Sequence, residues 1–135
     1  MASLLNDLLS ALLPEEIYLH FDLVSVQEHP NRIELRLEEH TELVPPALSS
    51  ENKVVLDGFC NPIELLNFPL RDKPTYLKFY RRRWKHSGSD KHYSNSYDLH
   101  PDGVKATHSF ASFLKDEAGL TPDEYLRSFF GTADE

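Results

Sequence analysis

Residues 32–38, Arg32-Ile33-Glu34-Leu35-Arg36-Leu37-Glu38, alternate strictly between polar and apolar side chains. Because successive side chains of a β-strand point to opposite faces, Ile33, Leu35 and Leu37 would all lie on one face. Such alternation is typical of an antiparallel strand that is buried on one side only. This segment predicts that the chain is built around a half-buried antiparallel sheet.

The residues before this strand predict its hairpin partner and two helices. Residues 21–27 are rich in β-forming side chains, and His29-Pro30-Asn31 has the composition of a turn. Residues 3–12 carry leucines at helical spacing, with Ser3 as the expected N-cap. Residues 14–21 open with proline and two glutamates, which suit the first turn of a second helix.

The residues after this strand predict further strands. Residues 40–53 have the composition of a loop, and short or irregular strands are expected at 54–56 and 62–68. Residues 75–85 are the clearest long strand in the chain, and after a turn residues 92–99 would form the next one.

Two helices are predicted at the C-terminal end. The first covers residues 105–117, with Gly119 as its C-cap. The second opens with Thr121-Pro122-Asp123-Glu124, a capping box, and stops at Gly131. This second helix is acidic at its start and aromatic at its end, which favours a core or partner-docking helix over a DNA-recognition helix.

The order of helices, then strands, then helices lacks the regular alternation of a parallel sheet. We therefore expect an α+β fold, an antiparallel sheet of hairpins flanked by N-terminal and C-terminal helices. The expected organisation is a single domain over residues 1–135, with N-terminal helices at 3–21, a hairpin sheet at 22–99 and a C-terminal helical pair at 105–130.

Positive charge is concentrated in one short part of the chain. The whole sequence has a net charge of −8, yet residues 71–91 hold eight Lys or Arg against Asp72 and Asp90. Asymmetry of this kind indicates a local site for a polyanion or an acidic partner.

The strand at 76–84 interleaves these cations with aromatic rings. Alternation would place Leu77 and Phe79 toward the core and Tyr76, Lys78, Tyr80, Arg82 and Trp84 on the opposite, exposed face. Such a face offers phosphate pairing together with base stacking, and two-stranded ribbons can enter a DNA major groove. The alternative interpretation is a solvated edge strand whose charges prevent aggregation.

The remaining sequence offers little catalytic chemistry. Cys60 is the only cysteine, so no internal disulfide is expected, and we expect a reducing, cytoplasmic location. We also expect Cys60 to be a small core residue and not a catalytic nucleophile. No pair of the seven histidines has metal-ligand spacing on a predicted helix, so we expect no metal, no cofactor and no catalytic residue. The apolar N-terminal stretch lacks the features of a signal peptide, and no run is long enough to span a membrane.

Several motifs resemble the N-terminal region of ISAon-type insertion-sequence transposases. They are Phe68-Pro69-Leu70-Arg71, Tyr76-Leu77-Lys78 leading into Arg81-Arg82-Arg83-Trp84, and Phe110-Ala111-Ser112-Phe113-Leu114-Lys115-Asp116-Glu117. The leucine-rich opening followed by Leu12-Leu13-Pro14-Glu15-Glu16 and Phe21-Asp22-Leu23-Val24 is also similar. The chain departs from the family pattern at Thr107-His108-Ser109, where a threonine-glutamate pair is expected.

The resemblance implies a DNA-binding or accessory role in DNA transposition, beside a catalytic domain of the three-carboxylate type that this chain does not contain. The chain would then be a separately encoded first reading frame or a remnant, acting with a separate transposase catalytic subunit.

The sequence leaves three hypotheses. The first is a non-catalytic module that contacts insertion-sequence ends through Lys78, Tyr80, Arg81, Arg82, Arg83, Trp84 and Lys85. The second is a protein–protein module, in which an acidic surface holds the basic strand of a second copy, or the leucine helix docks on the catalytic subunit. The third is a small hydrolase or metal enzyme.

Overall fold

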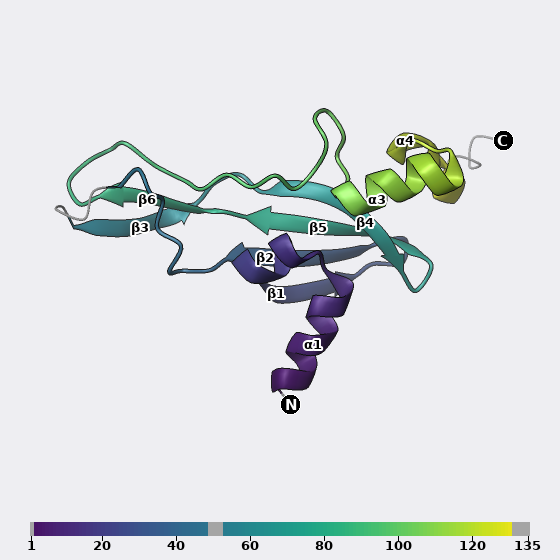
Figure 1. The fold of residues 1–135 in the computed structure, drawn as a ribbon, viewed down its shortest axis with the longest axis horizontal. Helices are drawn as coiled ribbons and strands as arrows, with labels where there is room; N and C mark the ends of the chain where they lie inside the picture. The colour runs from purple at the N-terminus through teal and green to yellow at the C-terminus, as the bar shows by residue number, and fades with distance from the viewer. Residues whose placement is uncertain (1, 49–52, 131–135) are drawn as a thin grey trace.

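The computed structural model describes residues 2–48 and 53–130. Helices stand at both ends of the chain and strands in the middle, which confirms the α+β class (Figure 1). The elements are α1 (Ala2–Leu12), α2 (Glu15–His20), β1 (Phe21–Glu28), β2 (Ile33–Glu39), β3 (Val54–Phe59), β4 (Ile63–Leu70), β5 (Lys73–Tyr80), β6 (Arg82–His86), α3 (His108–Phe113), the π-helical turn η1 (Leu114–Ala118) and α4 (Pro122–Phe130). Ser3 lies inside α1, so it is not the N-cap.

Four strands form the main sheet, in the order β1-β2-β5-β4. The predicted hairpin at 29–31 is confirmed: β1 and β2 pair antiparallel, and the His29 N–H donates to the Arg32 carbonyl at 2.8 Å. A second hairpin joins β4 to β5 through Arg71 and Asp72, both with positive φ. Between these hairpins β2 and β5 run parallel, so the sheet is mostly, and not wholly, antiparallel.

One face of this sheet carries the main core, as the alternation of residues 32–38 predicts. Ile33, Leu35 and Leu37 are all buried, and Leu77 and Phe79 of β5 are fully buried beside them. Ile17 of α2 packs on the same cluster, together with Phe21 and Leu99. The opposite face of these strands carries the charged residues between them.

The predicted long strand at 75–85 is wrong in one respect: it is two strands in two sheets. The break falls at Arg81, after which β6 pairs with β3 as a separate two-stranded ribbon. At the break the Arg81 carbonyl accepts from the Cys60 N–H at 2.9 Å, and the Arg82 N–H donates to the Glu39 side chain at 2.8 Å. Partners from distant parts of the sequence therefore satisfy the backbone at the switch.

Residues 92–99 do not form the predicted strand. A single bridge joins Tyr93 to Trp84, and the chain then runs on in extended but irregular form. Its polar side chains bond elsewhere: Asn95 and Tyr97 both donate to Glu39. The segment is held by side-chain contacts and not by a backbone ladder.

The C-terminal helices match their predicted caps more closely than their predicted lengths. The first begins at His108, with Thr107 accepting from the Phe110 N–H, and its last turn is π-helical up to Gly119 at φ 66°. The capping box is confirmed, because Thr121 and Glu124 exchange bonds of 2.9 and 3.2 Å. The predicted stop at Gly131 lies outside the described residues.

Candidate functional site

The basic-aromatic segment is divided between the two sheets. Lys78 and Tyr80 belong to β5 in the main sheet, whereas Arg83, Trp84 and Lys85 belong to β6 in the ribbon. The seven residues singled out from the sequence therefore do not form one continuous face.

Lys78 is neutralised by carboxylates on both neighbouring strands. Its Nζ lies 3.4 Å from Glu34 of β2 and 3.7 Å from Glu64 of β4. Glu34 is itself nearly buried and also pairs with Arg32 at 2.5 Å. Burial acts to raise the pKa of Glu34, but the charges of Lys78 and Arg32 outweigh it and hold that pKa below its ordinary value. Lys78 is thus committed to this charged face of the sheet.

Tyr80 is covered on the same face. The guanidinium carbon of Arg36 stands 3.8 Å from the centre of the Tyr80 ring, which is a close cation–π contact. The ring also meets Phe59 edge-on at 5.8 Å between centroids. Because its ring contacts Arg36 of β2 in the main sheet and Phe59 of β3 in the ribbon, Tyr80 joins the two sheets.

Arg82 anchors the switch between the sheets through Glu39. The Arg82 Nε donates to the Glu39 carbonyl at 2.7 Å, and its Nη2 lies 3.6 Å from Glu38. The Glu39 side chain is fully buried and accepts from the Arg82 N–H, Asn95 and Tyr97. Arg81 is held nearby, donating from Nη1 to the Asn95 carbonyl at 3.1 Å.

Sequence reasoning missed Glu39, although a signal was present. Glu39 continues the series Ile33, Leu35 and Leu37, so alternation places a carboxylate on the apolar face of β2. A charge at such a position requires buried donors, because an unpaired buried carboxylate is very costly. The chain supplies those donors from residues more than 40 positions away.

Trp84 is buried, with 5% of its surface exposed, so the prediction that it stands on an exposed stacking face is wrong. Its backbone exchanges hydrogen bonds with Tyr93 at 2.7 and 2.8 Å, which places the segment after the turn beside β6. The alternation of β5 does not carry through Arg81, because β6 follows the geometry of a different sheet.

Several cations of the ribbon remain open to solvent. Lys53 and Lys91 are exposed, and 42% of the Arg83 side chain is exposed. Arg83 and Lys85 lie on the same face of β6, opposite Trp84. Residues 53–59 and 83–92 hold four Lys or Arg against Asp57 and Asp90, which leaves a net charge of +2. Glu51 lies outside the described residues.

Asp57 is the carboxylate that organises this ribbon. The Arg83 Nε donates to the Asp57 carbonyl at 2.8 Å, and His92 hydrogen-bonds its carboxylate. The His92 contact, with smaller contributions from Lys85 and Arg83, holds the pKa of Asp57 below its ordinary value. Nothing in the sequence indicated that Lys53 belongs to this site. Pairing across the ribbon brings it beside the end of β6, where the Ser87 N–H donates to the Lys53 carbonyl at 2.8 Å.

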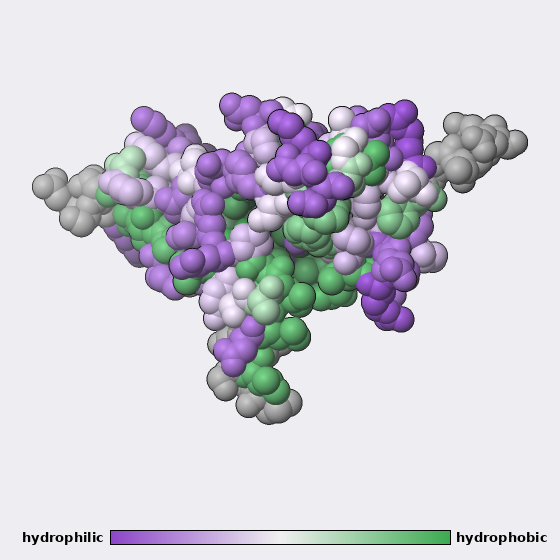
Figure 2. Space-filling model, turned by 45° about the vertical axis from the view of Figure 1, so that its right-hand side comes forward, coloured by the Kyte–Doolittle hydropathy of each residue, from purple (hydrophilic) through white to green (hydrophobic). Residues whose placement is uncertain are grey.

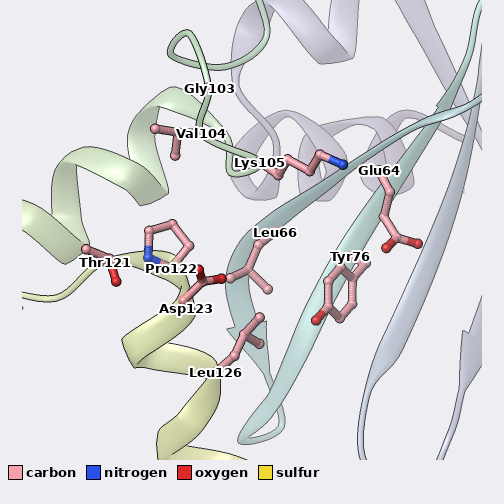
Figure 3. Close-up of a pocket in the computed structure, with 10 residues that line it drawn as sticks. All are labelled: Glu64, Leu66, Tyr76, Gly103, Val104, Lys105, Thr121, Pro122, Asp123 and Leu126. Atoms are coloured by element: carbon pink, nitrogen blue, oxygen red, sulfur yellow. The ribbon is translucent and has the colours of Figure 1, made fainter.

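A cavity of about 570 Å³ lies between the main sheet and α4 (Figure 3). Leu66 and Tyr76 come from the sheet, and Pro122 and Leu126 come from α4. Lys105 extends toward Glu64, which already pairs with Lys78. The polar groups at its rim are of mixed charge, so the cavity selects no clear class of ligand.

Two features of the described residues bear on other functions. No group of three or more His, Cys, Asp or Glu in this part of the chain is placed to hold a metal ion. No helix within it is long and apolar enough to cross a membrane. In comparisons with known proteins, no family model, curated protein or solved structure matches this chain.

Proposed function

We propose that this chain is a non-catalytic, cytoplasmic accessory module of DNA transposition that binds DNA through the β3–β6 ribbon. The transposition part rests on the sequence resemblance of residues 68–71, 76–84 and 110–117 to insertion-sequence transposases. The DNA-binding part rests on the shape and charge of the ribbon.

The observation that carries the DNA-binding proposal is the placement of the open cations. Figure 1 shows β3 and β6 at the end of the molecule opposite α4. The ribbon can therefore contact DNA while the acidic remainder of the chain stays away from the phosphates. A two-stranded ribbon is narrow enough to enter the DNA major groove. Arg83 and Lys85 on one of its faces, with Lys53 and Lys91 near its tip, would pair with phosphates on either side.

The structure narrows the set of residues proposed for this contact. Lys78 and Arg82 are occupied by carboxylates, the Tyr80 ring is covered, and Trp84 is buried. Arg81 donates to the Asn95 carbonyl within the chain. Arg83 also donates within the chain, to the Asp57 carbonyl, but 42% of its side chain stays exposed on the ribbon. Of the seven residues that the sequence indicated, Arg83 and Lys85 remain as proposed DNA contacts. Lys53 and Lys91 join them from the neighbouring parts of the ribbon.

Fluorescence anisotropy with labelled duplexes of the insertion-sequence ends tests this proposal. About four phosphate contacts predict a log–log slope of binding against salt of about −3 to −4. The double variant Arg83→Ala/Lys85→Ala should reduce this slope by about two and weaken binding on every duplex. The matched control, Lys105→Ala/Lys115→Ala, removes the same charge from exposed sites outside the ribbon. No binding at low salt, or equal losses in both double variants, would reject the proposal.

The alternative function, a protein–protein module, receives different support in its two forms. The acidic partner of the basic strand is already supplied within one chain, by Glu34, Glu38 and Glu64. Pairing of this strand with a second copy is therefore less favoured. Docking through the leucine helix has a separate observation in its favour, the exposed apolar surface around α1.

A further inference from the structure

An apolar groove of about 230 Å³ runs between α1 and the main sheet. Leu8 and Leu12 of α1 form one wall, and Val26, Leu35 and Phe68 contribute from the strands. Among the residues that the structure describes, no charged side chain lines the groove. It lies over Leu35 and Leu77, which belong to the same core cluster as Ile17 of α2.

Several apolar side chains at the edge of this groove are exposed. Leu4, Leu8 and Leu12 are 68%, 54% and 49% exposed and follow one another at intervals of four residues, so they form a stripe along α1. Val26 is 58% exposed on the sheet beside them. Figure 2 shows α1 projecting as a largely hydrophobic element that is continuous with a hydrophobic area of the body. Contiguous apolar patches larger than a few hundred Å² mark interaction sites.

The size of the groove favours side chains over a free ligand. Small-molecule sites occupy about 300–1,000 Å³, which exceeds this volume. A groove that is apolar, uncharged and flanked by a helix suits the insertion of an amphipathic helix through anchors at intervals of three or four residues. A membrane surface is disfavoured, because α1 carries no Lys or Arg and the chain has a net charge of −8.

We propose that the occupant is α1 of a second copy of this chain. This helix has the required form: a leucine stripe, and Asp7 as its single charged residue. One two-fold interface would place the stripe of each copy over the groove of the other, so that both exposed surfaces are covered at once. This inference is independent of the DNA-binding proposal, because the groove and the ribbon share no residue.

The two-fold axis fixes which residues meet. The stripe from Leu4 to Leu12 is about 12 Å long, at 1.5 Å per residue. When two such helices lie side by side and antiparallel, Leu8 at the midpoint faces Leu8 of the partner subunit. Leu4 then faces Leu12 of the partner subunit.

The charge of the chain gives this dimer a distinctive salt response. Each copy carries a net charge of −8, and the interface contributes no attractive ion pair to oppose that repulsion. Salt screens the repulsion and strengthens apolar association, so the dimer tightens as ionic strength rises. DNA binding through the ribbon changes in the opposite direction.

Analytical ultracentrifugation of the full chain over a range of concentrations and at two salt concentrations tests the proposal. The wild type should dimerise with a dissociation constant on the order of micromolar. Leu8→Lys should weaken the dimer at least tenfold, whereas Leu19→Lys should leave it unchanged. Leu19 is the matched control, because it is 52% exposed on α2 and does not line the groove. A monomeric wild type at all concentrations, or equal dimerisation of both variants, would overturn the proposal.

A cysteine crosslink tests the antiparallel arrangement without relying on a disruptive substitution. In a Cys60→Ser background, Leu8→Cys should form an intermolecular disulfide on mild oxidation, because the two residues meet at the axis. Leu19→Cys should stay monomeric under the same conditions. If Leu8→Cys crosslinks no faster than Leu19→Cys, the second copy is not the occupant, and a helix of the catalytic subunit becomes the candidate.

Discussion

The carboxylate of Glu39 accepts a hydrogen bond of 2.8 Å from the backbone N–H of Arg82, at the point where the chain passes from the main sheet into the ribbon. The two residues are 43 positions apart. Asn95 and Tyr97 donate to the other oxygen of the same carboxylate. Glu39 thus joins the end of β2, the start of β6 and the irregular segment that follows the ribbon.

Replacement of Glu39 by Gln should destabilise the protein by about 2 kcal/mol, because the amide retains one acceptor oxygen and loses charge-assisted bonds. Urea unfolding measures the change. Glu38→Gln is the matched control: Glu38 makes more open ion pairs with Arg36 and Arg82, so its loss should cost less than about 1 kcal/mol. Equal losses in both variants would show that the Glu39 contacts are not central to folding.

The Tyr97 hydroxyl gives stability a dependence on alkaline pH. Burial, and then the hydrogen bond to Glu39, raise the pKa of Tyr97 above its ordinary value. The folded state therefore holds this proton more tightly than the unfolded state, so stability is complete below about pH 10 and falls as pH rises further. Thermal melting between pH 8 and pH 11 should show this decline, with a smaller slope in Tyr97→Phe. Because the pKa values of Tyr76 and Tyr125 are also raised, some slope should remain. An unchanged slope in Tyr97→Phe would contradict the prediction.

Acid should loosen the ribbon through Asp57. The pKa of Asp57 is depressed, chiefly by its hydrogen bond with His92. The ionised carboxylate therefore stabilises the ribbon above the ordinary pKa of an aspartate, and this stabilisation is lost as pH falls below about 4. Trp84 is the only tryptophan and lies in β6, so its fluorescence reports on the ribbon. The acid-induced change in emission should be smaller in Asp57→Asn, while Asp98→Asn, at an exposed site outside the ribbon, should match the wild type.

Lys78 and Lys85 should differ in what they affect, although both belong to the basic segment. Lys78→Ala removes a partner of the buried Glu34 and should cost about 1–2 kcal/mol of stability, with DNA affinity unchanged. Lys85→Ala should weaken DNA binding, with stability changed by less than about 0.5 kcal/mol. Chemical denaturation and anisotropy on the same pair of variants separate the two roles. If Lys78→Ala loses DNA affinity, the prediction is wrong and Lys78 contacts DNA.

Local pattern predicted much of the fold because each of these elements depends on neighbours in sequence. The alternation of Ile33, Leu35 and Leu37 predicted the buried face of β2. Turn chemistry at residues 29–31 predicted the first hairpin, and Thr121 with Glu124 predicted the start of α4. Periodicity and capping act over two to four residues, so they can be recognised in a single chain.

The division of the basic segment could not be predicted in this way. The alternation of residues 76–84 gives no sign that Arg81 leaves one sheet for another, because the groups that satisfy the backbone there are Cys60 and Glu39. The same switch buries Trp84 and brings Lys53 beside β6. A candidate site built from one continuous face was therefore replaced by a ribbon assembled from two distant segments.

By itself, the sequence determined the α+β class, the buried face of the sheet and the concentration of positive charge between residues 71 and 91. Only the tertiary structure decided which of those charges are paired, which remain open on the ribbon, and which leucines of α1 stay uncovered beside the groove. The physical reason is the distance along the chain over which each property is determined. Periodicity and charge composition depend on neighbouring residues. Pairing and exposure depend on groups that only folding brings together, such as Glu39 and Arg82.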